Sequence, residues 1–365
     1  MATLFTPLKL DELELVNRIV IAPMCMYSAE HGKMTDWHIQ HLGNLAQSGA
    51  GLLIIEATAV EPHGRISYGD VGLWDDLTEQ AMQRVVDSIR RYSNMPIAVQ
   101  LGHAGRKGSC DVPWNGGQQI PPEQDLGWQT IAPSAEPCKQ TENPPHAMTE
   151  EDIVALKSHF VSAAQRAAKI GLDAIELHGA HGYLLHQFLS PLSNLRDDQY
   201  GGSLENRMRL VLEVFTEVRA VFPQGKPVGI RISATDWVRG GWDLQQSIAL
   251  AKALDEQGCS FIHVSSGGLS ENQQIEVGPG YQLHFAESIK QAVQMPVIAV
   301  GLITEPQQAE EVLQTGQADA VALARGILYD PRWPWHAAVE LGEKAIAAEQ
   351  YQRCAPHNHK DLFSK

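Results

Sequence analysis

Two histidines and a tyrosine lie within six positions, directly after an apolar stretch. The stretch is Ala174-Ile-Glu-Leu177, and the polar group after it is His178-Gly-Ala-His-Gly-Tyr183. Imidazole N–H groups can hold a substrate oxygen, and a phenol with an ordinary pKa near ~10 stays protonated at neutral pH and can deliver a proton. The pattern leaves three interpretations open: a metal site, a packed structural turn, or hydrogen-bond donors aimed at a substrate.

A metal site has the least support among these three. His178, His181 and His186 are the candidate ligands, but no nearby carboxylate or cysteine completes an obvious set. The five cysteines are scattered, at Cys25, Cys110, Cys138, Cys259 and Cys354. No Cys-x-x-Cys pair occurs among them, which argues against an iron–sulfur cluster or a structural zinc site. We therefore predict no bound metal.

The composition argues against two classes of partner. The chain has 28 Lys and Arg against 43 Asp and Glu, a formal net charge of -15, and no basic run. Nucleic-acid backbones require clustered cations, so we predict no nucleic-acid partner. The first residues lack the layout of a signal peptide, and no apolar segment approaches bilayer length. Together with the odd, dispersed cysteines, this predicts a cytoplasmic protein without membrane contact.

Eight short apolar runs predict the fold. Continuous apolar runs indicate strands buried on both faces, and helical segments between them indicate parallel pairing. Eight such units in 365 residues predict one domain, a closed (β/α)8 TIM barrel spanning 1–365. An open doubly wound sheet is less favoured because no Gly-x-Gly-x-x-Gly follows a strand. Helices are expected to open at Thr149 and at Thr304. The predicted strands are 18–24, 51–57, 96–100, 174–178, 227–233, 261–265, 296–301 and 320–325.

Three segments fall outside the repeat. Residues 4–17 predict a short N-terminal hairpin that closes the barrel floor. Residues 104–147, rich in Pro, Gly, Gln and Trp, are too long for an ordinary loop after the third strand. Because that loop leaves a strand at the mouth of the barrel, we interpret it as a lid. Residues 343–365 form a C-terminal tail.

The carboxyl ends of barrel strands converge on one pocket, and here these ends carry polar residues and glycines. Taken singly, each has a structural interpretation: Arg231 could pair a core carboxylate, and glycines could make turns. Loops after the seventh and eighth strands commonly bind phosphate, which Gly301 and Arg325 would suit. The strand ends are Pro23-Met-Cys-Met-Tyr27, Glu56-Ala-Thr58, Gln100-Leu-Gly-His-Ala-Gly-Arg106, His178 through Tyr183, Arg231, Ser265-Ser-Gly-Gly268, Gly301 and Ala324-Arg-Gly326.

Taken together, these motifs resemble one known family. The chain is similar over nearly its whole length to the Old Yellow Enzyme family of FMN-dependent ene-reductases. Cys25 together with Tyr27 resembles the thermophilic-like branch of that family. The further motifs that carry the resemblance are Asp36-Trp-His38, Gln187-Phe-Leu-Ser-Pro191, Asn194 and Tyr200-Gly-Gly-Ser-Leu-Glu-Asn-Arg207.

The resemblance implies noncovalent FMN over the barrel mouth. Gln100 would bond the pyrimidine edge of the flavin, and Arg231 would lie near N1 and O2 and stabilise the anionic reduced ring. The remaining implied contacts are Pro23, Met24, Cys25 and Ala57 along the isoalloxazine and Gly301, Ala324 and Arg325 at the phosphate. For Cys25 the alternative is a small buried thiol without a role in catalysis.

The resemblance also implies the reaction. Activated C=C bonds in enones, enals, maleimides and nitroalkenes would receive a hydride from reduced flavin N5. His178 and His181 would hold the substrate oxygen, Tyr183 would deliver the proton, and Tyr27 would contact the substrate. NADPH, with NADH as the alternative, would reload the flavin. Since no Rossmann fingerprint exists, both substrates would use one flavin face in turn, with ping-pong kinetics.

The implied assembly is a homodimer or homotetramer. Tyr351-Gln-Arg353 resembles an element that reaches a neighbouring subunit's site, which makes Arg353 a candidate substrate contact in trans. Cys354 and the residues after it, and Leu302, depart from the family pattern and leave the pocket shape open. A non-enzymatic FMN-storage protein is the competing function. Related barrel reductases with an iron–sulfur cluster do not fit the length or the cysteine spacing.

Overall fold

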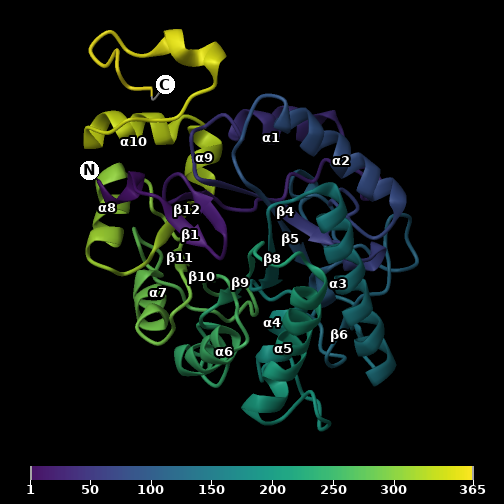
Figure 1. Cartoon of the computed structure of the whole chain (residues 1–365). Coiled ribbons are helices and arrows are strands. Elements are labelled where there is room, and N and C mark those ends of the chain that lie inside the picture. Colours follow the sequence, from purple (N-terminus) through teal and green to yellow (C-terminus); the bar gives the residue numbers. More distant parts are fainter. Residues whose placement is uncertain (1, 364–365) are drawn as a thin grey trace.

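The computed structural model describes residues 2–363, and eight parallel strands in that range form a closed barrel. Each strand overlaps one of the eight predicted runs, so the barrel prediction is confirmed. Figure 1 shows the strands enclosed by helices. The strands are β3 Ile19–Ile21, β4 Leu52–Ala59, β5 Ile97–Gly102, β8 Ala174–Gly179, β9 Val228–Ser233, β10 Ile262–Ser265, β11 Val297–Ala299 and β12 Ala320–Leu323, with β12 pairing back to β3.

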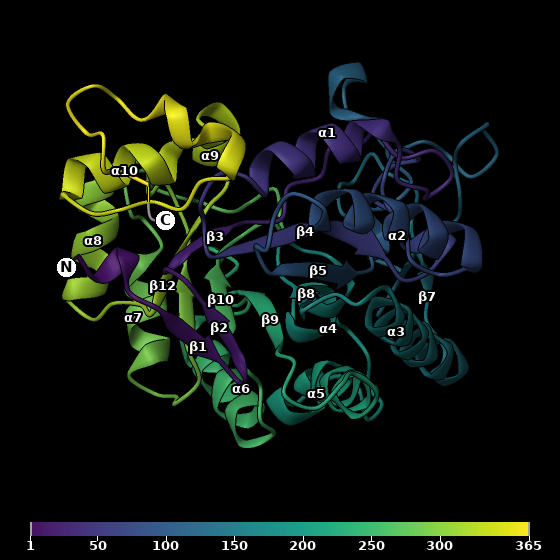
Figure 2. The same cartoon turned by 45° about the horizontal axis from the view of Figure 1, so that its top comes forward.

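Helices connect successive strands and cover the outside of the barrel (Figures 1 and 2). Strands β8 and β9 are buried at every residue, because one face packs on these helices and the other fills the barrel. This explains the continuous apolar runs. The helices are α1 Asp36–Leu45, α2 Asp76–Arg90, α3 Glu150–Ile170, α4 Leu184–Leu189, α5 Leu204–Val221, α6 Leu244–Glu256, α7 Leu283–Lys290, α8 Pro306–Gln314, α9 Arg325–Tyr329 and α10 Trp333–Leu341.

The predicted N-terminal hairpin closes one end of the barrel. Strands β1 Leu8–Leu10 and β2 Leu13–Leu15 pair antiparallel. Leu8, Leu10 and Leu15 belong to the same buried cluster as Val20 and Leu52, which lie on β3 and β4. The hairpin therefore seals the floor, and the strand carboxyl ends open at the opposite end.

One of the two predicted helix starts is confirmed, and the other is wrong by one residue, because the cap of α8 is Glu305. Thr149 caps α3, where its hydroxyl accepts from the Asp152 N–H and the Asp152 carboxylate accepts from the Thr149 N–H. Helix α8 begins at Pro306 and not directly after Thr304, and Glu305 before it is extended, with φ -97° and ψ 141°. The physical reason is that a residue before proline is pushed out of the helical region, so the helix begins at the proline.

The long segment 104–147 is fastened to loops at the barrel mouth. It contains the short strands β6 Ile131–Ala132 and β7 His146–Ala147 and two 3₁₀ turns, Gly105–Lys107 and Pro113–Asn115. Arg106 Nη2 donates to the Leu269 carbonyl at 3.1 Å, and Trp128 Nε1 donates to the His63 carbonyl at 3.0 Å. These bonds tie the segment to the loops after β10 and β4.

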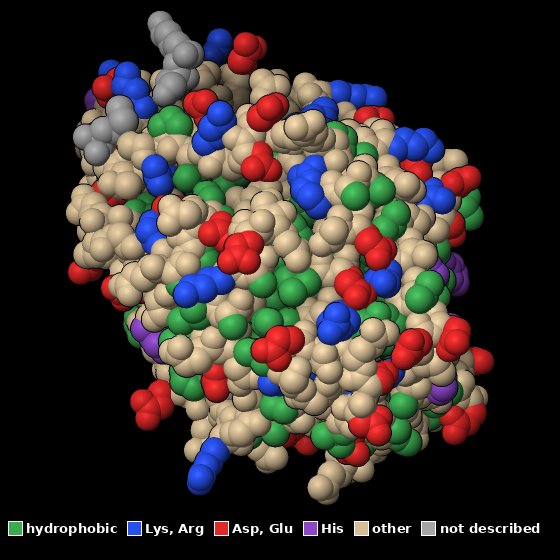
Figure 3. All heavy atoms as spheres, turned by 60° about the horizontal axis from the view of Figure 1, so that its bottom comes forward, with side chains coloured by type: hydrophobic (Ala, Val, Ile, Leu, Met, Phe, Trp, Pro, Cys, Tyr) green, Lys and Arg blue, Asp and Glu red, His purple; other side chains and the backbone are tan. Residues whose placement is uncertain are grey.

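The C-terminal tail folds back on α10 at the periphery of the barrel (Figure 1). Trp335 of α10 packs edge-on against Phe363 and Tyr351, with ring centroids 4.9 and 5.8 Å away. Among the described residues, no helix has both the length and the apolar character needed to cross a membrane. On the face shown in Figure 3, Lys and Arg side chains are interspersed with Asp and Glu and form no extended patch.

Candidate active site

The structure brings His178, His181 and Tyr183 together at the carboxyl end of β8. The His178 ring lies 5.2 Å from the His181 ring and 4.9 Å from the Tyr183 ring, in each case nearly perpendicular. Tyr183 is the residue immediately before α4. The turn that links the strand to this helix therefore presents two imidazoles and a phenol at one corner of the barrel mouth.

This turn adopts a conformation that its surroundings enforce. His181 and Gly182 both have left-handed φ values, 58° and 74°, which is strained for histidine. A Cβ on Gly182 would lie 2.3 Å from the Gly268 carbonyl oxygen, so only glycine fits there. Four side chains bond the turn's backbone: Ser233 accepts from His181 N at 2.9 Å, Lys107 donates to His181 O at 2.8 Å, His186 accepts from Gly182 N at 2.9 Å, and Gln187 donates to Gly182 O at 2.7 Å.

Burial sets the protonation of all three side chains. Burial and the nearby Arg231 cation hold the pKa of His178 and the pKa of His181 well below the ordinary value, so both imidazoles are neutral. The Ala180 N–H donates to His178 Nδ1 at 3.3 Å, which assigns the proton of that ring to Nε2. Burial also raises the pKa of Tyr183 well above 10. At neutral pH the corner therefore holds neutral donors and a protonated phenol.

A buried carboxylate organises the neighbouring strands. Glu176 accepts from Gln100 Nε2 at 2.7 Å and from His263 Nδ1 at 2.8 Å, and neither Glu176 nor His263 has an exposed side chain. Because the Gln100 amide nitrogen is committed to Glu176, its carbonyl oxygen is the group left for another partner. Burial, followed by the effect of Arg231, lowers the pKa of His263, which keeps that imidazole neutral.

Arg231 is a buried cation that forms no salt bridge or hydrogen bond with the described residues. It pairs in register with His178, is 8% exposed, and its Nε has no hydrogen-bond partner. Within residues 2–363, no carboxylate lies within salt-bridge distance of it, so the alternative of a core ion pair is not supported. Buried charges are costly without a partner. This orphaned guanidinium fits a ligand with an electron-rich polar edge, as the pyrimidine side of a flavin has.

The segment after β3 supplies a partly open, weakly polar surface. Met24 and Cys25 are half-buried, Pro23 is buried, and Ala57 pairs in register with Gln100. Burial, with the nearby Asp70 and Glu56 carboxylates, raises the pKa of the Cys25 thiol well above its ordinary value, so it stays uncharged. Apolar side chains and a neutral thiol can pack against the face of an aromatic ring.

Tyr27, two residues further along, faces the segment 104–147. Its backbone has a left-handed φ of 51°, and its ring meets the edge of Trp114 at 6.1 Å. Burial, followed by nearby acidic groups, raises the pKa of Tyr27, so its phenol is protonated. The long loop therefore reaches the substrate-contact residue that the sequence predicts.

Strands β11 and β12 pair with each other, and their carboxyl ends form a second corner of the barrel mouth. Gly301 has φ 129°, and a Cβ there would lie 2.6 Å from Gln282 Nε2. Ala324 directly precedes α9, and Arg325 begins it with an exposed side chain. Within the described part of the chain, the Arg325 guanidinium has no hydrogen-bond or ion-pair partner. A phosphate could come close to the backbone at Gly301 and pair with the free guanidinium of Arg325.

A small cavity lies at the first corner, lined by Ala57, Gly102, His178 and Tyr183 among others. A larger cavity, of about 300 Å³, lies elsewhere, between α1, the start of β5 and the tail, and is lined mainly by uncharged residues. We place the site at the smaller cavity, because the perturbed titratable groups converge there. Arg353 is exposed on a 3₁₀ helix, Glu349–Cys354, in the peripheral tail and is not brought to this corner.

Sequence reasoning missed three buried groups. Glu176 and His263 lie inside strands, and Asp236 lies in the loop after β9. His186 was considered only as a metal ligand, whereas its two nitrogens contact Gly182 N and Asp236. A glutamate inside the apolar run 174–177 was a usable signal, because a charge in a doubly buried strand must be paired.

Comparison with known proteins identifies the chain. The NADH:flavin oxidoreductase / NADH oxidase family matches residues 3–343. The chain belongs to this family. The NADPH dehydrogenase of Bacillus licheniformis is 43% identical over 352 residues, which cover 96% of this chain and 98% of that protein. An NADH:flavin oxidoreductase of Gibberella zeae is 43% identical over 363 residues, with coverage of 95% and 87%.

Solved structures agree with this assignment. Morphinone reductase superposes with a TM-score of 0.77 at 30% identity, and the match covers 94% of this chain and 91% of that one. The resemblance to the Old Yellow Enzyme family is thus confirmed. The protein is an NAD(P)H:flavin oxidoreductase of the NADPH dehydrogenase type, with FMN as its cofactor.

Proposed function

We propose that this enzyme reduces activated C=C bonds, in enones, enals, maleimides and nitroalkenes. The observation that carries the proposal is the convergence of two neutral imidazoles and a protonated phenol, with ring centroids about 5 Å apart, beside the unpartnered Arg231. An alkene conjugated to a carbonyl or nitro group needs donors for its oxygen and a proton for its α carbon. This corner offers both.

The residues would hold the cofactor as follows. Gln100 presents its carbonyl oxygen and Arg231 its cation to the pyrimidine edge. Bound there, FMN supplies the hydride for the β carbon of the alkene. The ring would lie on Pro23, Met24, Cys25 and Ala57, and the phosphate would be held by Gly301, Ala324 and Arg325.

His178 and His181 would bind the substrate oxygen. Both rings are neutral, and His178 would offer its Nε2 proton. His181 Nε2 lies 2.8 Å from Ser265 Oγ, so with Ser265 as the donor to Nε2 the N–H that His181 would offer is on Nδ1. As negative charge grows on that oxygen, these fixed donors stabilise it without reorganising. Tyr27, with its protonated phenol at the mouth, is a further contact for the substrate.

Tyr183 would give its proton to the α carbon. The raised pKa of Tyr183 keeps the phenol protonated at neutral pH. The proton transfer leaves a phenolate, and Lys107 Nζ, 5.0 Å from the ring centroid, supplies a cation beside it. Solvent returns the proton before the next turnover.

NADPH, or NADH as the alternative, would occupy the same position in turn. The chain has no dinucleotide fingerprint that would hold a nicotinamide coenzyme separately. Shared occupancy predicts ping-pong kinetics. Parallel double-reciprocal lines support this, whereas intersecting lines would contradict it.

We further propose that segment 104–147 covers the mouth, supported by the Tyr27–Trp114 contact. We also propose a homodimer or homotetramer in which Arg353 reaches the neighbouring site, supported by its exposure on the tail. A cross-link from an Arg353→Cys variant to a residue of the partner's mouth would test that arrangement.

Tyr183→Phe tests the main proposal against an FMN-storage role. The variant should keep FMN and its reduction by NADPH, while reoxidation of its flavin by cyclohexenone slows by about 10²–10⁴-fold. Tyr92→Phe, on a tyrosine that is 60% exposed, is the matched control and should reoxidise like the parent. Parent-like reoxidation of Tyr183→Phe would remove the proposal.

A further inference from the structure

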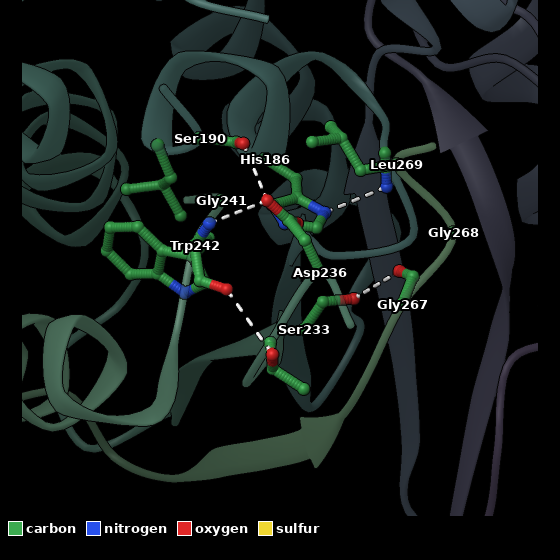
Figure 4. Close-up of polar contacts among 12 residues, drawn as sticks. His186, Ser190, Ser233, Asp236, Gly241, Trp242, Gly267, Gly268 and Leu269 are labelled. Carbon is green, nitrogen blue, oxygen red and sulfur yellow. Dashed lines mark hydrogen bonds and ion pairs between the residues drawn. The ribbon is translucent and has the colours of Figure 1, made fainter. Parts of the chain in front are cut away.

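The turn that carries His181 and Tyr183 rests on a buried pair, His186 and Asp236. His186 lies within α4, and its Nδ1 accepts the Gly182 N–H at 2.9 Å. Its Nε2 lies 2.9 Å from Asp236 Oδ1, and neither side chain is exposed. Figure 4 shows the imidazole of His186 beside the Asp236 carboxylate. Neither residue lines the site described above.

The proton positions in this pair follow from the bonds. Because Nδ1 accepts from an amide N–H, its lone pair is in use and the ring proton of neutral His186 is on Nε2. The Nε2 proton faces the Asp236 carboxylate, whose Oδ1 is 2.9 Å away in an ion-pair contact that is not aligned as a hydrogen bond, and the negative charge there keeps Nδ1 free to accept. Both nitrogens of His186 are committed, so this histidine has none left for a metal.

Asp236 fastens the end of α4 to the loop after β9. Its Oδ2 accepts from Ser190 Oγ at 2.6 Å, directly after the helix, and from Trp242 N at 2.7 Å (Figure 4). A Cβ on Gly241 would lie 2.6 Å from the same oxygen, so the loop after β9 closes tightly around it. Burial alone would raise the pKa of Asp236, but the nearby His186 and the bonds from Ser190 and Trp242 lower it, so the carboxylate is ionised.

We propose that His186 and Asp236 are a positioning pair for the proton-delivery step. The carboxylate selects the Nε2–H form of His186, that form holds the Gly182 amide, and the amide fixes the left-handed turn that aims His181 and Tyr183. This inference rests on the proposed function of Tyr183. A carboxylate that holds an imidazole in one tautomer is an established way of orienting a catalytic group.

Asp236→Asn tests the pair with almost no change in shape. If its carbonyl stays with Ser190 and Trp242, the new amide NH₂ faces His186 Nε2 and favours the tautomer with the proton on Nδ1. Nδ1 then cannot accept from Gly182, and the turn loses that bond. Asp243→Asn is the matched control, because this exposed carboxylate caps α6 in the same loop without contacting the turn.

The measurement is the limiting rate of flavin reoxidation in stopped flow at saturating acceptor. With cyclohexenone, Asp236→Asn should be at least about tenfold slower than the parent and Asp243→Asn unchanged. With 1,4-benzoquinone, which needs no proton on carbon, Asp236→Asn should stay within about threefold. Equal slowing with both acceptors indicates general damage to the site and overturns the inference.

A double variant separates this inference from the proposed function. In a Tyr183→Phe background, adding Asp236→Asn should cost little more, because both changes remove the same proton delivery. Multiplicative losses would overturn the inference. If Tyr183→Phe alone keeps parent turnover, the proposed function fails. If Tyr183→Phe is slow while Asp236→Asn matches the parent, only the positioning pair fails.

A measurement on the parent holoenzyme keeps the inference testable if Asp236→Asn does not fold. Nitrogen-15 spectra of the histidine rings should show His186 neutral with the proton on Nε2, assigned by loss of the signal in His186→Gln. A proton on Nδ1 would overturn the proposed chain of bonds.

Discussion

Glu176→Gln is the sharpest test of how the barrel strands organise the cofactor site. The change replaces one carboxylate oxygen by an NH₂ group at a side chain with no exposure. The carboxylate accepts two bonds, from Gln100 Nε2 and His263 Nδ1. A glutamine can accept only one of them unless His263 moves its proton to Nε2, an atom that has no partner now. The variant therefore keeps its packing but loses two charge-assisted bonds.

The expected cost is about 3 kcal/mol in the free energy of unfolding of the apoprotein. Bonds to a charged group contribute about 1.5–3 kcal/mol each and neutral ones about 1 kcal/mol, so the two exchanges cost roughly 2 kcal/mol. Arg231 also loses the carboxylate that most favours its charged form, which adds roughly 1 kcal/mol. FMN affinity should fall by about tenfold, because the Gln100 amide is no longer oriented.

Urea unfolding of apoprotein and fluorescence titration with FMN measure the two effects. Glu310→Gln is the control: this buried carboxylate on α8 accepts from the N–H groups of Thr3 and Leu4, next to the N-terminus. It should also lower stability but leave FMN affinity unchanged. The reasoning is refuted if Glu176→Gln matches the parent in both measurements, or if both variants weaken FMN equally.

Three further predictions follow from single residues. Gly301→Ala should lose FMN about tenfold faster on dialysis, because its Cβ would meet Gln282 Nε2 at 2.6 Å with φ at 129°; equal retention would contradict the phosphate assignment. Burial raises the pKa of Asp70 to about 7, so the folded state holds this proton more tightly than the unfolded chain and stability falls as the pH rises from ~4 to 7. Asp70→Asn should lose less stability than the parent between pH 5 and pH 8, by roughly 2 kcal/mol in urea unfolding, and parallel pH curves would count against this. Arg353→Ala should lower enone turnover several-fold if the tail reaches a neighbouring site, and unchanged steady-state activity would remove the support for that role.

The fold could be predicted from the sequence because a strand that is buried on both faces consists of consecutive apolar residues. In β8 and β9 every residue is buried, so the apolar runs are continuous and their count gives the barrel. The start of helix α8 was predicted wrongly because two neighbouring sequence signals disagree. Thr304 and Pro306 favour different first residues for helix α8. The fixed φ of Pro306 determines where the helix begins.

The candidate site was predictable where its residues lie at strand ends or within one turn, and not where buried side chains pair across elements. His178, His181 and Tyr183 lie in one turn, and their spacing left a metal site, a structural turn and substrate donors open until the family resemblance favoured the donors. His186 and Asp236 are 50 residues apart, and their pairing depends on how the loop after β9 folds around Gly241. Glu176 carried a signal, a lone acid in a buried strand, but its partners Gln100 and His263 come from two different elements of the barrel.

The central claim is that one flavin at this mouth passes electrons from NADPH to an activated alkene. The most direct test is the visible spectrum of the purified protein during an anaerobic titration. The account predicts flavin absorption at one FMN per chain, bleaching on addition of one equivalent of NADPH, and full recovery on addition of cyclohexenone. A protein that takes up no FMN, or whose bleached flavin is not reoxidised by the enone, would contradict it.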